Sequence, residues 1–425
     1  MIHLQFPYGK GFLEADLPRE RVQAVLTSEL ESYRPDVDAE TLVRRALANP
    51  IGTAPLSELS RGKRRVTIIA SDHTRPVPSR LLMPLLLRQI RTGNPEADIT
   101  ILIATGCHRE TTREELVAKF GEDIVAREKI VIHDCDDTAN MVLLGTLPSG
   151  GECWVNRLAC EADLLVSEGF IEPHFFAGYS GSRKAVLPGV AGRSTVLANH
   201  CAEFIDHPAS RAGSLADNPI HRDMVWAARK AGLAFILNVV LNGEKEIIHA
   251  VAGDMEQAHQ AGCRFLEGLC GVEAAMADIV ITTNGGYPLD QNIYQAVTGM
   301  TAAEAAVRED GVIIMLAKSN DGHGGAAFCR ELMAGDDMDA LMADILRRGR
   351  GETLPDQWQA QIMIRILQRA KVVYISDAED ELVRRLHMTP AHSLHEALEL
   401  AEDLLGKKDA TITAIPDGVG VIVHG

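Results

Sequence analysis

Residues 66–76, VTIIASDHTRP, join a continuous apolar run to a polar loop. The run Val66–Ala70 has the length and the β-branched composition of a strand buried on both faces. The loop that follows it carries an aspartate, a histidine and an arginine. In open parallel sheets, ligands bind beyond the carboxyl ends of the strands. This stretch therefore predicts a parallel sheet with a ligand site at its edge.

The same kind of apolar run recurs along the chain, separated by helical patterns. Six further runs are expected to be strands: Ile99–Ala104, Ile130–His133, Asp163–Ser167, Asp278–Thr283, Val312–Ala317 and Lys371–Ser376. One intervening helix is expected over Arg113–Phe120, after a threonine cap and before Gly121. Another is expected over Ser79–Arg91, with Pro84 near its start or at a kink. Strands alternating with helices predict an α/β fold with mainly parallel sheets.

One segment departs from this alternation. Residues 235–241 and 247–251, joined by the turn NGEKE, are typical of an antiparallel hairpin. A helical stretch follows, and the strand–helix alternation then starts again. A chain of 425 residues is long for one domain. We therefore expect an N-terminal α/β domain over 1–270 and a C-terminal α/β domain over 271–425, with an active-site cleft between them.

Composition excludes several classes of function. The chain has 59 acidic and 42 basic residues and a net charge of −17, which disfavours binding to nucleic acids and anionic membranes. A local cationic site for a small anionic substrate is compatible with this charge. No apolar run approaches the ~20 residues that span a bilayer, and no signal peptide is evident. Eight cysteines without a CxxC pair predict a reduced, cytoplasmic protein.

Polar loops follow five of the expected strands. Their sequences are SDHTRP at 71–76, TGCHRE at 105–110, EGFIEPH at 168–174, NGGYP at 284–288 and KSNDGHGG at 318–325. Turns alone do not require histidine or arginine, so the repetition predicts a shared functional site at the edges of the sheets.

The densest polar segment is EGFIEPHFFAGYSGSRKAVLPGVAGRSTVLANH, residues 168–200. Its glycines would expose backbone N–H groups and allow close approach by a phosphate. Ser194 is a candidate cap for a helix that ends near His200. Neither GxGxxG nor GxxxxGK[ST] is present, so a dinucleotide or P-loop site lacks its usual motif.

Several side chains in these loops are candidates for chemistry. Lys184 could be a nucleophile or covalent anchor with a lowered pKa, or a surface lysine beside Arg183. Arg75 could bind a carboxylate, or form a salt bridge with Asp72. The candidates for proton transfer or metal binding are His108, His174 and His200.

A second group of candidates lies in the C-terminal half. Side chains at 291, 294, 295 and 298 would share one face of a helix, which could line the cleft or pack between the domains. His323, in DGHGG, could bind a ligand or occupy a turn.

These motifs, together with NGGYPLDQNIYQAVTGM at 284–300, resemble the lactate racemase family that uses the nickel-pincer nucleotide. The resemblance extends over essentially the whole chain. It implies two α/β domains with the site between them. It also implies a cofactor, the nickel-bound pyridinium-3-thioamide-5-thiocarboxylic acid mononucleotide, attached covalently to Lys184. The enzymes that synthesise this cofactor would be partners.

The resemblance also implies a role for each candidate residue. His200 would bind nickel, and His108 and His174 would be the two acid/base groups. Arg75 and Gln295 would contact the substrate. Asp72 and Tyr294 would lie near the cofactor.

The implied activity is that of an isomerase, a racemase or 2-epimerase of 2-hydroxy acids. It would transfer hydride reversibly to the cofactor through a 2-keto acid intermediate. Lactate racemases resemble one another in carrying lysine at position 298, where this chain has Thr298. This difference predicts a substrate larger than lactate, such as the aldonic acid gluconate, with Thr298 at its side.

Three alternatives remain open. The first is a lactate racemase proper. The second is a pyridoxal-phosphate racemase with Lys184 as the Schiff-base lysine. The third is a non-catalytic carrier of a nickel nucleotide, which would not need both His108 and His174.

Overall fold

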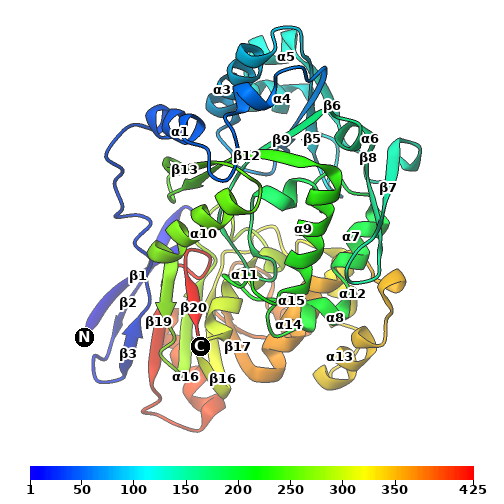
Figure 1. The fold of residues 1–425 in the computed structure, drawn as a ribbon. Coiled ribbons are helices and arrows are strands. Elements are labelled where there is room, and N and C mark those ends of the chain that lie inside the picture. Colours follow the sequence, from blue (N-terminus) through cyan, green and yellow to red (C-terminus); the bar gives the residue numbers. More distant parts are fainter. The chain divides into compact units, whose positions relative to one another are not determined.

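The computed structural model describes residues 1–425 (Figure 1). The chain forms two compact units. The central unit comprises Leu30–His200 and His207–Gly268, and the terminal unit comprises Met1–Glu29, Cys201–Asp206 and Leu269–Gly425. The expected domains, 1–270 and 271–425, place a boundary close to the one between Gly268 and Leu269 in the structure. They differ from the structure because residues 1–29 and 201–206 belong with the C-terminal residues.

The central unit contains a six-stranded sheet in the order β13-β12-β9-β4-β5-β6. The strands are β4 (Arg65–Ser71), β5 (Asp98–Ala104), β6 (Lys129–Ile132), β9 (Leu164–Phe170), β12 (Leu233–Leu241) and β13 (Ile247–Gly253). All pairs are parallel except β12 with β13. The four strands expected in this half, and the hairpin, are therefore confirmed.

The hairpin extends the sheet instead of interrupting it. Strand β12 pairs in parallel with β9, with Ile236 opposite Ser167, before it turns back into β13. Nearly every residue of β12 is buried, as expected for a strand with a neighbour on each side and cover on both faces.

Helices and short strands surround this sheet. They are α1 (Ala39–Ala48), α2 (Leu56–Leu59), α3 (Ser79–Gly93), α4 (Arg113–Phe120), α5 (Glu122–Arg127), η1 (Thr138–Asn140), β7 (Met141–Thr146), β8 (Glu152–Asn156), α6 (Arg157–Cys160), β10 (Pro173–His174), β11 (Gly178–Tyr179), η2 (Ser182–Ala185), α7 (Arg193–Asn199), α9 (Pro219–Ala231) and α10 (Gln257–Cys270). Helix α4 has the expected capping box between Thr112 and Glu115 and ends at Gly121. Helix α3 buries Leu82 and Leu86 in the core cluster that includes the sheet residue Ile68.

The terminal unit contains an all-parallel sheet in the order β18-β17-β16-β15-β19-β3. Its strands are β3 (Val22–Val25), β15 (Ala277–Thr283), β16 (Val307–Leu316), β17 (Ala370–Ile375), β18 (Thr389–Ala391) and β19 (Ile412–Ile415). Two further pairs are β1 (Ile2–Tyr8) with β2 (Gly11–Leu17), and β14 (Gly271–Glu273) with β20 (Ile422–His424). In Figure 1 the blue strand β3 lies beside the red strand β19, its partner in the sheet.

The helices of the terminal unit are α8 (Ala202–Asp206), α11 (Ile293–Glu304), α12 (Ala326–Leu332), α13 (Met338–Leu346), η3 (Arg350–Glu352), α14 (Gln357–Arg369), α15 (Asp380–Arg385) and α16 (Leu394–Leu405). The short helix α8 belongs here because it packs on α14, where Gln361 Nε2 donates to the Ala202 carbonyl at 2.8 Å. No helix has the length and apolar character needed to span a bilayer.

Candidate functional site

The loops after β4 and β5 meet because these strands are parallel neighbours, with Ser71 opposite Ala104. Asp72 and His108 follow these two positions. The Nδ1 atom of His108 lies 2.7 Å from Oδ2 of Asp72. The other carboxylate oxygen of Asp72 accepts from the backbone N–H of Thr74 at 3.2 Å and from its hydroxyl at 2.7 Å.

Asp72 is a buried carboxylate held in its ionised form. Burial raises its pKa, but the hydrogen bonds from His108 and Thr74 outweigh this and leave the pKa below its usual value. The carboxylate therefore accepts the Nδ1 proton of His108. That tautomer has its lone pair on Nε2, the arrangement of an oriented general base.

Arg75 lies in the same loop and is exposed. Its guanidinium donates to the Thr74 hydroxyl at 3.2 Å, and its carbonyl accepts from Lys119 Nζ at 3.2 Å. The alternative salt bridge with Asp72 is not formed, since Asp72 pairs with His108. The exposed guanidinium can bind a carboxylate.

Phe176 contacts three of the candidate side chains. It lies in the loop between β10 and β11 and is buried. Its ring centroid lies 4.5 Å from that of His174 and 5.2 Å from that of His200, with both imidazoles approaching edge-on. The ammonium of Lys184 lies 5.8 Å from the same centroid. His174, Lys184 and His200 are thus brought together around one phenyl ring.

His174 is held as a neutral imidazole. Its Nδ1 accepts from the backbone N–H of Ala177 at 3.3 Å, and its ring stacks on Phe175 with centroids 5.1 Å apart. Burial lowers the pKa of His174 well below its usual value, and the nearby charges of Lys184 and Arg75 lower it further. A neutral histidine beside a cationic cluster can exchange a proton with a substrate hydroxyl.

Lys184 lies in the tight turn η2, which the glycines around it permit. Gly181 has a φ of +82°, and a Cβ at Gly189 would meet the Ala185 carbonyl at 2.3 Å. Lys184 is half-buried, unlike the surface lysine of the alternative interpretation. Burial lowers its pKa well below the usual value, with a further contribution from Arg183. A lowered pKa increases the unprotonated fraction of the amine, which is its nucleophilic form.

His200 caps the carboxyl end of α7, and its Nδ1 lies 3.0 Å from the Val196 carbonyl. The Nδ1 proton must be donated there, so the lone pair of the ring lies on Nε2. Burial, followed by the charge of Lys184, lowers the pKa of His200 to about 3. A neutral imidazole oriented through its other nitrogen is the form that binds metals. The helix begins after Gly192, so the expected cap at Ser194 is wrong.

Arg183 is a residue whose importance the sequence did not indicate. It is among the largest fully buried side chains. Its guanidinium donates to the carbonyls of Ala177 at 2.8 Å and Ser180 at 3.1 Å, and its Nε donates to His221 Nδ1 at 3.0 Å. It therefore fixes the backbone between β10 and Lys184. An arginine next to a lysine in sequence carries no signal of such burial.

The remaining candidates lie on α11 of the terminal unit. Tyr294 donates to Asp356 at 3.1 Å and is half-buried, as is Thr298, whereas Gln295 is exposed. Position 291 precedes the helix cap Asn292, so it does not share the helical face as expected. Contacts of α11 with cofactor or substrate stay a prediction, as does the interdomain cleft.

His323 lies in a turn of the terminal unit. Its Nδ1 accepts from the backbone N–H of Gly325 at 3.0 Å, and its carbonyl accepts from the N–H of Tyr294 at 3.1 Å. Both contacts are those of a structural turn residue, which favours the turn interpretation over ligand binding.

Comparisons with known proteins agree across the whole chain. Residues 8–213 match the family model of the lactate racemase N-terminal domain, and residues 272–423 match that of the lactate racemase C-terminal domain. A curated lactate racemase from Thermoanaerobacterium thermosaccharolyticum is 56% identical over 425 residues, covering 100% of both chains. One from Lactiplantibacillus plantarum is 52% identical over 424 residues, again with 100% of each chain covered.

Solved structures give the same result. The lactate racemase apoprotein from T. thermosaccharolyticum superposes with a TM-score of 0.96 at 55% identity over 100% of both chains. A Thermotoga maritima protein shares the fold alone, with a TM-score of 0.64 at 18% identity over 91% of this chain and 98% of its own.

The fold and the sequence matches to curated lactate racemases together define an isomerase of the racemase class. The chain belongs to the lactate racemase family, whose members are nickel-dependent. The expectation of a substrate larger than lactate is not supported, because both curated relatives are named for lactate. The alternative interpretation, a lactate racemase proper, fits better.

Proposed function

We propose that this chain interconverts the two enantiomers of lactate, with a nickel-pincer nucleotide attached to Lys184. The observation that carries the proposal is the full-length identity of 56% and 52% to two curated lactate racemases. The exposed guanidinium of Arg75 supports a small carboxylate substrate, even on a chain with a net charge of −17.

The residues of the central unit fit the proposed cofactor. Lys184 presents an amine of lowered pKa, which suits covalent attachment. His200 is oriented by the Val196 carbonyl with its lone pair on Nε2, which suits a nickel ligand. When bound, the cofactor would accept and return the hydride of the substrate carbon.

The chain's own residues would bind the substrate and move its proton. Arg75 would hold the carboxylate in both directions of the reaction. His108 would take the hydroxyl proton through Nε2, and Asp72 would stabilise the imidazolium that forms. His174 would do the same for the opposite enantiomer. Gln295 and Thr298 would contact the substrate, and Tyr294 the cofactor.

The site geometry disfavours the other interpretations. A carrier of a nickel nucleotide has no use for a base oriented by a buried carboxylate, as His108 is by Asp72. A pyridoxal-phosphate enzyme would use Lys184 but would not need His200 as a metal ligand. Absorbance and nickel content of the purified protein distinguish the two cofactors.

Cofactor-synthesis enzymes are the proposed partners, because the chain would receive the nucleotide from them. None of the eight cysteines forms a disulfide bond. This supports the proposed cytoplasmic location, where thiols stay reduced.

The test uses full-length protein made together with cofactor-synthesis enzymes. We expect nickel and a cofactor mass increment on the wild type, and conversion of L-lactate to a racemic mixture by chiral chromatography. His200→Ala should lose nickel, whereas His108→Ala and His174→Ala should retain nickel and lose activity. His395→Ala, an exposed histidine of the terminal unit, is the control.

Equal loss of nickel in all three site variants would contradict the assigned roles. Turnover should be compared between lactate and longer 2-hydroxy acids, where each tenfold preference corresponds to about 1.4 kcal/mol. Loaded enzyme that turns over a longer acid and leaves lactate unchanged would overturn the proposed substrate.

A further inference from the structure

We propose that Cys107 and Cys135 form a thiol–disulfide site beside His108, at which oxidation by a low-molecular-weight disulfide reversibly changes the position of that base. The two cysteines lie in neighbouring loops of the central unit. Neither has a role in the proposed reaction.

Sheet register brings these loops together. Strands β5 and β6 are parallel neighbours, with Ile103 opposite Ile132. Beyond their ends, the Thr105 hydroxyl donates to the His133 carbonyl at 2.6 Å, and the His133 N–H donates to the Ile103 carbonyl at 3.1 Å. Cys107 and Cys135 each lie two residues beyond these contacts, on loops that the two hydrogen bonds hold together.

Thiol–disulfide exchange needs one accessible thiol with a low pKa and a second thiol beside it, and the two cysteines differ in exposure and in pKa. Cys107 is exposed, whereas Cys135 is buried. Interaction with the Cys135 thiol lowers the pKa of Cys107 to about 7, and Arg193 contributes in the same direction. The same interaction, together with burial, raises the pKa of Cys135. Cys107 is therefore the attacking thiolate, and Cys135 is the resolving thiol.

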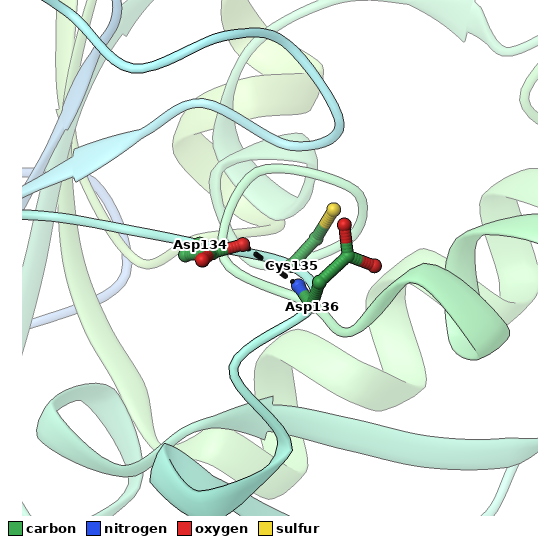
Figure 2. Close-up of side chains that lie close together, drawn as sticks. All are labelled: Asp134, Cys135 and Asp136. Carbon is green, nitrogen blue, oxygen red and sulfur yellow. Dashed lines mark hydrogen bonds between the residues drawn. The ribbon is translucent and has the colours of Figure 1, made fainter.

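Surrounding charges favour a thiolate over a bound cation. Figure 2 shows Cys135 between Asp134 and Asp136, and their ligand atoms lie within 4.8 Å of one another. Both oxygens of Asp136 are occupied by the Arg193 guanidinium at 2.7 Å, and Asp134 accepts from the Asp136 backbone at 2.9 Å. A metal ion here would meet a guanidinium, whereas a thiolate is stabilised by it.

The chemistry balances with glutathione disulfide as the oxidant. The Cys107 thiolate attacks one sulfur of the oxidant, which forms a mixed disulfide and releases one glutathione thiolate. Cys135 then gives up its proton and attacks the Cys107 sulfur, which releases the second glutathione thiolate. The two protein thiols are oxidised to one disulfide, and one glutathione disulfide is reduced to two glutathiones.

Disulfide formation would move His108, because this residue directly follows Cys107 in the chain. Its imidazole depends on a 2.7 Å hydrogen bond to Asp72. Drawing the Cys107 sulfur into a covalent bond shifts the loop that carries this imidazole. Misplacement of a catalytic group by about 1 Å can cost a hundredfold in rate. This effect on rate rests on the proposed function, whereas the disulfide itself does not.

The first measurement is a peptide map of the full-length chain treated with glutathione disulfide and then alkylated. The wild type and the control Cys160→Ser should give a cross-link between the peptides of Cys107 and Cys135. Cys135→Ser should stop at glutathione on Cys107, and Cys107→Ser should give neither product. Retention of glutathione on Cys107 in the wild type, or pairing of Cys107 with another cysteine, would contradict the proposed pairing of Cys107 with Cys135.

The second measurement is lactate racemisation by the loaded enzyme. Treatment should lower the wild-type rate at least tenfold, and dithiothreitol should restore it. Cys107→Ser, which forms neither product, should keep its rate under the same treatment. Equal loss in wild type and Cys107→Ser would overturn the effect on His108. A loaded enzyme inactive before treatment would instead contradict the proposed function and leave the peptide map valid.

Discussion

The imidazole of His200 lies edge-on against the ring of Phe176, with the two centroids 5.2 Å apart and the rings inclined at 81°. The same phenyl ring contacts His174 and lies under the Lys184 ammonium. Three groups with different proposed roles therefore share one apolar support. Replacing that support should disturb all three together.

We expect Phe176→Leu to reduce both nickel retention and attachment of the cofactor to Lys184. The leucine leaves part of the space empty, so the imidazole of His200 and the amine lose their common contact. Phe235→Leu is the control, because Phe235 is fully buried in a core cluster of the same unit that does not include Phe176. Nickel content and intact mass of loaded protein test the prediction. Equal losses of nickel and cofactor in the two variants would show that Phe176 acts only as a core residue.

Asp72→Asn should lower lactate turnover by about 10²–10⁴, the range for a general base. An asparagine can present its NH₂ to His108 Nδ1 and so favour the wrong tautomer. The variant should also lose stability at neutral pH, because the pKa of Asp72 is lowered in the folded chain. That contribution is present above the unfolded pKa of about 3.9 and disappears as pH falls through the folded pKa.

Thermal unfolding of Asp72→Asn and wild type, measured from neutral pH downward, checks this sign. The difference in Tm should shrink on acidification. Asp98→Asn, an exposed aspartate at the start of β5, is the matched control. A difference in Tm that grows with acid would contradict the assigned charge state of Asp72.

The sequence predicted those parts of the fold that local patterns determine. Buried β-branched runs marked the strands, and the threonine–glutamate spacing marked the capping box of α4. The meeting of Asp72 with His108 also follows from sequence, because both lie in the loops that follow neighbouring strands of one parallel sheet. Parallel strands end at the same edge of a sheet, so the loops that follow neighbouring strands lie close together.

Long-range pairing could not be predicted in this way. Arg21 Nε donates to the Ala410 carbonyl across 389 positions, and β3 joins the sheet of the terminal unit through β19. A four-residue strand does not specify its partner. Phe176 and Arg183 were missed for the same reason, since their importance lies in contacts that no spacing encodes.

Arg183→Lys should destabilise the chain by several kcal/mol, because each buried carbonyl left without a donor costs about 1–3 kcal/mol. A lysine cannot reproduce the planar set of bonds to Ala177, Ser180 and His221. Denaturant unfolding measures the loss, with Arg222→Lys on the exposed face of α9 as control. A stability equal to that of the control would show that the guanidinium bonds are dispensable.

Lys184→Met should raise the Tm of the cofactor-free chain at neutral pH, although it removes the proposed anchor. The pKa of Lys184 is lowered well below its usual value, chiefly by burial. Below the unfolded pKa of about 10.4, the unfolded chain binds a proton that the folded chain holds poorly, so this lysine destabilises the folded state. Stability should therefore rise with pH in the wild type, and the advantage of methionine should fade toward about pH 10.

Lys230→Met, at an exposed lysine of α9, should leave Tm unchanged. A methionine variant less stable than wild type at neutral pH would mean that Lys184 is a solvated ammonium, which could not serve as the neutral nucleophile that cofactor attachment requires.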